Sequence, residues 1–453
     1  MRLEKDSVGY LEIPDESYYG VHTQRAVHNF NITGRRLDKD FIISLAEVKK
    51  ALAQANYDLG VLSEKKMTAI TKSAEEIIGG KLHDEILVDP IQGGAGTSSN
   101  MNINEVIANR AIELLGGTKG DYDLVNPNDD VNKGQSTNDI YPTAGKLTML
   151  KKIPKLMEQL YLLRDTFLEK SKEFDDVIKL GRTQLQDAVP ITLGQEFHAY
   201  YSVIKRGIKR LETAKKEMES INLGGTAIGT GISAHPKLSE TVLTKLVNIT
   251  GEPLEISDDL VDATQNVENY VVLSDALKAI AISLSKIAND IRLLSSGPKT
   301  GIGEIKIPAK QNGSSIMPGK INPVIPEVMN QCSFLVMGNN VTIGLAAEHG
   351  QLELNAFEPI IFYKLIESFE VLTHGVETFN ENCVKGIEAD RDRCRENLER
   401  STYMATPLAE KIGYARAADI AKESVASGRT VKEIAKDYNV PDEVLDNLKV
   451  RVN

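Results

Sequence analysis

One short segment near residue 320 carries the polar side chains best suited to chemistry. It reads GSSIMPGKINP over residues 313–323 and brings Ser314, Ser315, Lys320 and Asn322 close together in the chain. Hydroxyl, amide and ammonium groups in one place favour the binding of a carboxylate. Prolines and glycines on both sides of the lysine fix the backbone around it, which is unusual for a plain connecting loop. The segment is therefore a candidate anion-binding site.

Three further polar segments interrupt a sequence that is otherwise helical in pattern. They are IQGGAGTSSN at residues 91–100, QSTND at 135–139 and GRTQLQD at 181–187, and the first two look like loops. Their short side chains can donate hydrogen bonds to a carboxylate, and helix N-termini favour anions as well. Taken alone, each of these segments is more simply interpreted as an ordinary loop or helix cap.

Residues 313–323 match the GSSxxPxKxNP signature of the aspartase/fumarase superfamily, and the chain resembles that family over almost its whole length. The other three polar segments match the family's remaining active-site segments in the same order. YYGVHT at 18–23, GRTQLQDAVP at 181–190 and NLGGTAIGTG at 222–231 resemble aspartases more than class II fumarases. Fumarases tend to carry Trp-Gly-Ala-Gln-Thr in the first of these places. At position 184 fumarases carry His, as do some aspartases.

The resemblance implies a lyase that reversibly eliminates ammonia from L-aspartate to give fumarate. Removing the C–H proton beside the β-carboxylate needs donors that hold the resulting charge as an aci-carboxylate. By resemblance, Ser314 is the general base and Glu327 a supporting residue. Substrate binding is assigned to Thr97, Ser136, Thr137 and Ser315 for the β-carboxylate, Lys320 and Asn322 for the α-carboxylate, and Asn138 and Thr183, with Gln184 nearby, for the ammonium.

The role of Gln184 is open, because a glutamine cannot titrate and so cannot shuttle protons as a histidine could. Its partner by resemblance is Glu327. The alternative is that Glu327, just after Pro326, is a first-turn carboxylate that favours the helix dipole. The segment around Ser314 is expected to be a mobile loop that closes over substrate, with Gly313 and Gly319 as hinges.

Composition narrows the class of protein. The 453 residues predict two or three domains, and the net charge of -11 argues against a nucleic-acid or anionic-membrane binder. No apolar stretch at the N-terminus or elsewhere predicts a signal peptide or a membrane helix. Three cysteines without CxxC spacing and seven scattered histidines predict a reduced, cytoplasmic protein without a metal site or cofactor. The paired glycines at 94–96 and 229–231 lack the third glycine of a dinucleotide-binding loop.

Apolar residues at helical spacing predict the elements that position these segments. Helices are expected over residues 41–58, from 147 onward, and over 197–218, 259–294, 326–348 and 358–387. The helix over 259–294 is apolar almost all round, which predicts burial on every side. A bundle of such long helices leaves a wide apolar surface, so we expect a homo-oligomer with a multi-subunit helical core. The resemblance implies a tetramer whose active sites each draw on three subunits.

The predicted fold is mainly α, in the three-domain aspartase/fumarase-like arrangement. The expected domains are a mixed, mainly helical domain at 1–139, a central long-helix bundle at 140–389 and a small C-terminal helical domain at 390–453. The sequence departs from the family pattern at residues 409–411, where relatives commonly read Asn-Pro. The alternatives are a class II fumarase, a relative acting on a substituted aspartate, and a non-catalytic helical scaffold protein.

Overall fold

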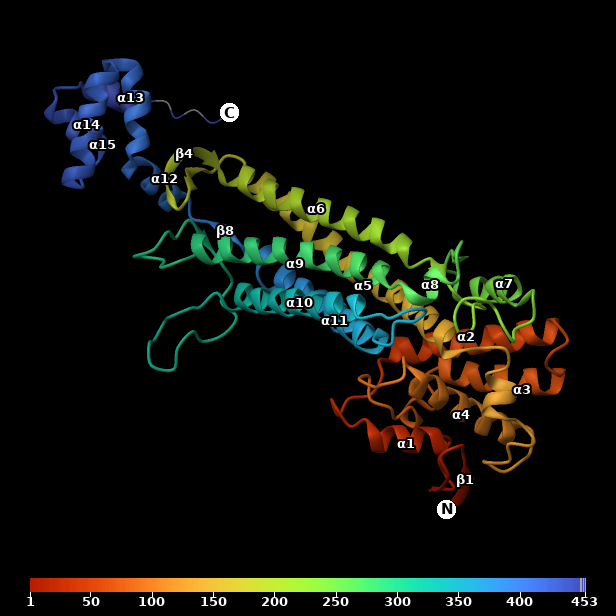
Figure 1. The fold of residues 1–453 in the computed structure, drawn as a ribbon. Helices are drawn as coiled ribbons and strands as arrows, with labels where there is room; N and C mark the ends of the chain where they lie inside the picture. Colours follow the sequence, from red (N-terminus) through yellow and green to blue (C-terminus); the bar gives the residue numbers. More distant parts are fainter. Residues whose placement is uncertain (449, 451, 453) are drawn as a thin grey trace. The chain divides into compact units, whose positions relative to one another are not determined.

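The computed structural model describes residues 1–448, 450 and 452, and Figure 1 shows it as a ribbon. Packing divides the chain into two compact units. Unit 1 comprises Met1–Leu156, Lys209–Ala279 and Leu335–Val371, and unit 2 comprises Met157–Ile208, Ile280–Phe334 and Leu372–Asn453. Each unit is discontinuous in sequence because five long helices contribute residues to both. The division into three domains at residues 139 and 389 remains a prediction.

The N-terminal part of unit 1 is built from a short hairpin and four helices. Their bounds are β1 Arg2–Lys5, β2 Tyr10–Ile13, α1 Val21–Asn29, α2 Lys39–Asp58, α3 Glu64–Ile78 and α4 Thr97–Leu114. Helix α2 packs on α3 and on α7 (Leu238–Thr250), and α4 packs on α1 and α3. The Asp38 carboxylate accepts hydrogen bonds from the first N–H groups of α2, a favoured N-cap. The helix predicted over 41–58 is confirmed.

Five long helices follow, and they confirm the predicted helical runs. They are α5 Thr137–Glu173, α6 Leu193–Glu217, α9 Glu268–Leu294, α10 Val324–Glu348 and α11 Glu358–Asn382. Three bounds differ from expectation by five residues or more. Helix α5 begins at Thr137 rather than at residue 147. Helix α9 begins later, because the extended backbone of Asn266 separates it from the short α8 (Asp262–Gln265). Helix α11 ends earlier, before a 3₁₀ turn at Val384–Gly386.

Aromatic contacts tie these helices together within each unit. In unit 1, Tyr141 of α5 stacks on Phe362 of α11 at 5.2 Å between ring centroids, and Tyr270 of α9 lies 5.0 Å from Phe362. In unit 2, Phe197 of α6 lies 5.2 Å from Phe174, just after α5, and the Tyr200 hydroxyl donates to Asp290 of α9 at 3.0 Å. The long helices therefore pack on one another in both units.

Helix α9 corrects one expectation about burial. Leu277, Leu284 and Ile291 are buried, but Val272 and Ile282 are 44% and 50% exposed in the single chain. The prediction that this helix is buried on every side is therefore wrong for one chain by itself, because its own neighbours cover only part of its apolar surface.

The polar segment at residues 181–187, between α5 and α6, is part of an antiparallel hairpin. Strand β3 (Ile178–Thr183) pairs with β4 (Gln186–Thr192) through a turn at Gln184 and Leu185, whose φ values are 54° and 63°. Such left-handed conformations are typical of two-residue hairpin turns. The remaining strands are short: β5 Ser220–Ile221 is parallel to β6 Glu255–Ile256, and β7 Ile305–Lys306 is antiparallel to β8 Glu388–Ala389.

Five small helices close the chain. They are α12 Arg391–Arg400, α13 Ala405–Ile412, α14 Tyr414–Ser427, α15 Val431–Asp437 and α16 Asp442–Asp446. Leu408, Ile420 and Ile434 anchor a hydrophobic cluster of their own, and Figure 1 shows α13–α15 grouped together. The capping box predicted at Thr430 is present, with Glu433 as its second member. The departure from the family pattern at 409–411 falls inside α13.

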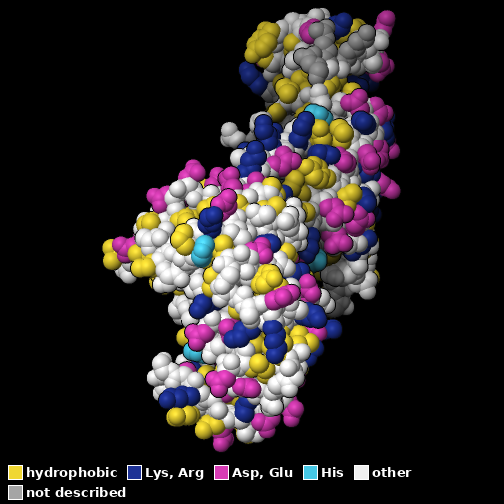
Figure 2. All heavy atoms as spheres, turned by 90° about the vertical axis from the view of Figure 1, so that its right-hand side faces the viewer, with side chains coloured by type: hydrophobic (Ala, Val, Ile, Leu, Met, Phe, Trp, Pro, Cys, Tyr) yellow, Lys and Arg dark blue, Asp and Glu magenta, His cyan; other side chains and the backbone are white. Residues whose placement is uncertain are grey.

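The surface agrees with the charge balance of the sequence. Figure 2 shows Lys and Arg side chains intermingled with Asp and Glu over the face that it presents. This face therefore lacks the single-sign field that nucleic-acid binding requires. Within the part of the chain that the structure describes, no helix is long and apolar enough to cross a membrane.

Candidate active site

The predicted site residues fall into two groups by unit. Thr97, Ser136, Thr137 and Asn138 belong to unit 1. The residues of unit 2 are Thr183, Gln184, Ser314, Ser315, Lys320, Asn322 and Glu327.

Thr97 is the first residue of α4. The predicted loop is therefore shorter than expected, because Thr97 to Asn100 form the first turn of a helix. Gly96 precedes the helix with a φ of 88°, and the Thr97 hydroxyl donates to the Gly94 carbonyl at 2.7 Å. The N–H groups of Thr97 and Ser99 already donate to the Gly94 carbonyl and to the Gln92 side chain, each at 3.0 Å. The positive end of the helix dipole still favours an anion here.

The second polar segment of unit 1 lies at the start of α5. A π-helical turn at Pro127–Val131 leads into it, and the helix begins at Thr137. The Ser136 hydroxyl accepts a hydrogen bond from the Asn138 N–H at 3.2 Å, and the Asn138 side chain donates to the Ala227 carbonyl at 2.7 Å. This second helix N-terminus also presents hydroxyl and amide groups.

Asp139 holds the backbone of this helix start in place. Its carboxylate accepts hydrogen bonds from the N–H groups of Ser136 (3.1 Å), Gly224 (3.1 Å) and Thr226 (3.0 Å). Burial raises the pKa of Asp139 to about 6, against the opposing effect of these three donors. Asp139 therefore holds the Ser136 backbone, just before α5, beside the backbone of residues 224–226.

The structure brings the first two polar segments together. The Asn100 side-chain amide, one turn into α4, donates to the Thr137 hydroxyl at 3.1 Å. A side-chain hydrogen bond thus joins the first turns of α4 and α5 within unit 1. This arrangement can bind a carboxylate.

In unit 2, the segment around Ser314 is a loop whose two ends are hydrogen-bonded to each other. The Gly313 N–H donates to the Lys320 carbonyl at 2.9 Å, and the Asn322 side chain donates to the Gly313 carbonyl at 2.6 Å. A Cβ atom at Gly313 would lie 2.2 Å from the Lys320 carbonyl oxygen, so only glycine allows this closure. Lys320 and Ser315 are exposed within the loop.

Ser314 accepts two backbone hydrogen bonds. The N–H groups of Ile316 and Met317 donate to its hydroxyl oxygen at 3.2 Å and 3.0 Å. Two donors on one oxygen stabilise negative charge there, which is what a serine alkoxide needs.

Thr183 and Gln184 stand at the tip of the β3–β4 hairpin. Arg182, the residue before them, donates to the buried carboxylate of Glu304 at 3.0 Å, and Lys179 lies 3.1 Å from the same group. A buried charge cluster therefore anchors the base of the hairpin. The described residues include no hydrogen bond between Gln184 and Glu327, which is half-buried in the first turn of α10, so their pairing remains a prediction.

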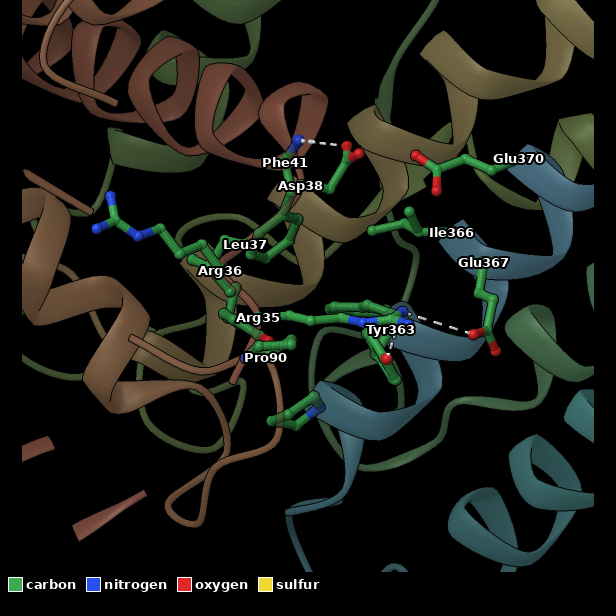
Figure 3. Close-up of a pocket in the computed structure, with 13 residues that line it drawn as sticks. Arg35, Arg36, Leu37, Asp38, Phe41, Pro90, Tyr363, Ile366, Glu367 and Glu370 are labelled. Carbon is green, nitrogen blue, oxygen red and sulfur yellow. Dashed lines mark hydrogen bonds and ion pairs between the residues drawn. The ribbon is translucent and has the colours of Figure 1, made fainter. Parts of the chain in front are cut away.

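A well-formed pocket in unit 1 lies away from the predicted residues. It has a volume of about 170 Å³, and Figure 3 shows Arg35, Tyr363 and Glu367 around it. Arg35 donates to the Tyr363 hydroxyl at 2.9 Å and pairs with Glu367 at 3.8 Å. Arg36 donates to the Asp84 carbonyl at 2.9 Å. Its cations are thus already engaged, and the pocket is a poor match for a carboxylate.

Sequence reasoning gave no role to several buried polar residues beside the site. Asn100 and Asn104 lie one turn apart on α4, and Lys49 of α2 is fully buried. Asparagines at helical spacing were the available signal, but the buried face of α4 is itself largely polar, so the pair did not stand out. Among the described residues, no group of three or more His, Cys, Asp or Glu side chains could hold a metal ion.

Two protein families match this chain. The family described as "Lyase" matches residues 9–338, and the family "Fumarase C C-terminus" matches residues 404–449. An aspartate ammonia-lyase of a Bacillus species is 49% identical over 97% of this chain and 94% of its own length. The C-terminal match includes residues 409–411, so the departure there is local.

Two solved structures share the fold along nearly the whole chain. The fumarate lyase:delta crystallin from Brucella melitensis bound to cobalt has a TM-score of 0.94 and 50% identity, covering 99% of this chain and 98% of its own. A recombinant class II fumarase from Schistosoma mansoni has a TM-score of 0.93 at 34% identity, covering 99% and 98%.

Proposed function

This chain belongs to the aspartase/fumarase superfamily of lyases, and we infer from this membership that it eliminates ammonia from L-aspartate to give fumarate. The observation that carries the inference is the 49% identity with an aspartate ammonia-lyase over nearly the full length of both chains. The class II fumarase structure has nearly the same TM-score as the Brucella melitensis fumarate lyase, 0.93 against 0.94, but is only 34% identical to this chain. The protein is thus a carbon–nitrogen lyase, and the fumarase alternative is less supported.

We propose Ser314 as the general base that removes the C–H proton. A serine hydroxyl is a weak base unless its alkoxide is stabilised. The two backbone N–H groups that donate to its oxygen support this role. Lys320 lies in the same closed loop and supplies a cation. Closure of the loop over substrate would place the base and exclude water.

The other predicted residues divide the charges of L-aspartate between them. Thr97, Ser136, Thr137 and Ser315 are proposed donors to the β-carboxylate, where charge develops in the transition state. The two helix N-termini that carry the first three of them support that proposal. The proposed α-carboxylate ligands are Lys320 and Asn322, and the proposed ammonium acceptors are Asn138 and Thr183, with Gln184 beside them and Glu327 in support.

Members of this family act on small molecules and are generally oligomeric. For this chain we propose a homotetramer whose active sites combine residues of several subunits. Support comes from α10, where Phe334, Leu335, Val341 and Leu345 are each more than half exposed in the single chain. Apolar side chains at this spacing on one helix need a partner. We further propose a cytoplasmic location, since Cys332, Cys383 and Cys394 are free thiols.

A coupled assay tests the function. Purified protein is given L-aspartate or L-malate in parallel, and fumarate and ammonia are measured together. We expect equal amounts of fumarate and ammonia from L-aspartate and none from L-malate. Fumarate from L-malate alone would move the assignment to a fumarase. Sedimentation velocity on the same sample tests the tetramer, and a stable, active monomer at micromolar concentration would contradict it.

A further inference from the structure

The hydroxyl group of Thr137 stands at the end of a hydrogen-bonded series of polar side chains, of which Lys49 and Asn100 are buried and Asn132 and Gln135 half-buried. Lys49 is 0% exposed and donates to the Asn132 side-chain oxygen at 2.9 Å and to the Gln135 side-chain oxygen at 2.7 Å. The Asn132 oxygen also accepts from the Asn100 amide at 3.2 Å, and Asn100 donates to Thr137 at 3.1 Å. All these residues belong to unit 1.

In this series of hydrogen bonds, the donor or acceptor role of each side chain is fixed by the side chain before it. Burial lowers the pKa of Lys49 to about 7. In its ammonium form this group can only donate, so the atom of Asn132 that faces it is the oxygen. The Asn132 nitrogen agrees, because it donates to the Gln135 carbonyl at 3.3 Å. The atom of Asn100 that faces an acceptor-only oxygen must then be its nitrogen. Its second proton reaches Thr137, so the Thr137 oxygen acts as an acceptor there.

A hydroxyl that already accepts has its own proton left for another group. Among the described residues, the hydrogen bonds of the Thr137 hydroxyl include no acceptor for that proton. Thr137 is the first residue of α5, so its proton and the helix N-terminus can act on the same anion.

We propose that Asn100, oriented by Lys49 through Asn132, is a positioning residue that sets the Thr137 hydroxyl as a donor toward the substrate carboxylate. This rests on the proposed function, in which Thr137 binds the β-carboxylate. The β-carboxylate gains charge in the transition state, so the Thr137 donor stabilises the transition state more than the bound substrate. Loss of Asn100 should therefore lower kcat more than it raises KM. Loss of a donor of this kind costs about 10²–10³-fold in rate, so its misdirection should cost about 10–100-fold.

Asn104 provides a matched control. It is as buried as Asn100, and its amide donates to the same Asn132 oxygen at the same distance of 3.2 Å, but it does not reach Thr137. Loss of either amide leaves a similar cavity and removes one bond to Asn132. Asn100→Ala should lower kcat by about 10–100-fold, whereas Asn104→Ala should lower it by less than about threefold.

A double-mutant cycle with Thr137→Val decides whether Asn100 acts through that hydroxyl. If it does, adding Asn100→Ala to Thr137→Val should cost less than about threefold more, because the hydroxyl is already gone. Equal losses in the two asparagine variants, or an undiminished cost in the Thr137→Val background, would overturn the proposal. Asn100→Ser replaces Asn100→Ala in the cycle if circular dichroism shows that the alanine variant is unfolded.

The proposed activity and the proposed role of Asn100 can be contradicted independently of each other. A wild-type protein that releases no fumarate from L-aspartate contradicts the proposed function. The same cycle, measured by calorimetry of succinate binding, then still tests the orientation of Thr137. Coupling between Asn100 and Thr137 is expected, though smaller than in kcat, and additivity or an absence of succinate binding by the wild type is the contrary result. Normal wild-type activity with additive variants leaves the function standing and removes the role of Asn100.

Discussion

A Cβ atom built on Gly96 would lie 2.4 Å from Cδ2 of Tyr141, inside the ring's contact distance. Gly96 directly precedes Thr97, and Tyr141 lies one turn beyond Thr137 on α5. The ring is fully buried and also stacks on Phe362. The absence of a side chain at Gly96 therefore lets the starts of α4 and α5 approach each other.

Gly96→Ala should weaken both the fold and the activity. The φ of 88° costs an alanine about 1–2 kcal/mol, and the contact with a buried ring adds about 1–3 kcal/mol. We expect the free energy of unfolding to fall by about 2–5 kcal/mol, with kcat lowered because Thr97 must shift. Chemical denaturation and the fumarate assay measure the two effects.

Gly94→Ala is the matched control. Gly94 has a similar φ of 87°, but a Cβ there would meet only the Thr97 side chain at 3.8 Å, an ordinary contact distance. The backbone cost of about 1–2 kcal/mol should remain without the steric cost. Equal destabilisation by the two substitutions would show that the approach of Tyr141 is unimportant.

Ser314→Ala should abolish turnover while leaving the fold intact. Loss of a general base typically costs about 10²–10⁴-fold, so kcat should fall by at least about 10²-fold. The side chain is half-buried in a loop, and its removal should change stability by less than about 0.5 kcal/mol. Steady-state kinetics and thermal unfolding of the same sample check both expectations.

Ser296→Ala controls for the general effect of losing a loop serine. Ser296 is also half-buried, and its hydroxyl accepts from the Ile302 N–H at 3.1 Å, much as Ser314 accepts from Met317. We expect normal kcat in that variant. Near-normal turnover by Ser314→Ala would refute its assignment as the base.

The long helices were predictable from sequence because each repeats apolar residues at 3.6-residue spacing over many turns. Leu147, Leu156 and Phe167 are all buried on α5, as their spacing requires. The start of α4 was not predictable in the same way, because its buried face is polar. Ser99, Asn100 and Asn104 are buried there, and a polar buried face has no hydrophobic period to detect.

Buried ionisable groups were not predictable from the sequence for another reason. The local sequence does not distinguish Lys49, Glu304 or Glu358 from solvent-exposed residues, because the groups that surround them come from distant parts of the chain. The family motif could point to Ser314 and Lys320 but not to the groups that orient them. The hairpin at 178–192 was also missed, because its turn uses Gln184 and Leu185 in a conformation that favours glycine or asparagine.

Glu304→Gln should destabilise unit 2 and reduce activity. The Glu304 carboxylate is 0% exposed and contacts Lys179 (3.1 Å), Arg182 (3.0 Å) and the Asn397 side chain (3.1 Å). Removing one partner of a buried ion pair costs about 3–5 kcal/mol, because the other charges stay buried. Since Arg182 adjoins Thr183, kcat/KM for L-aspartate should fall as well. Denaturation and kinetics provide the measurements.

Glu196→Gln tests whether the two ion pairs of Lys179, with Glu196 and with Glu304, contribute equally to stability. The Glu196 carboxylate also lies 3.1 Å from Lys179, but its side chain is 25% exposed and Lys179 keeps Glu304 as a partner. We expect a loss of less than about 1 kcal/mol. A Glu304→Gln protein as stable and active as the wild type would contradict the anchoring role.

Glu358→Gln should remove a pH dependence of stability. Burial raises the pKa of Glu358 to about 8 from an ordinary value of 4.5, only partly offset by the Lys146 cation. Between about pH 4.5 and 8 the native protein therefore retains a proton that the unfolded chain has released, so stability falls as pH rises through this window. The loss is about 1.4 kcal/mol for each unit of pKa difference, up to a few kcal/mol.

A glutamine side chain cannot ionise, so the Glu358→Gln variant should escape that loss. We expect this variant to unfold at about the wild-type temperature at pH 5 and at a higher temperature than wild type at pH 8, in calorimetric scans. Glu353→Gln, at an exposed position shortly before α11, should follow the wild-type curve at every pH. Parallel curves for wild type and Glu358→Gln would mean that the carboxyl is ionised in the native state at neutral pH, with Lys146 outweighing its burial.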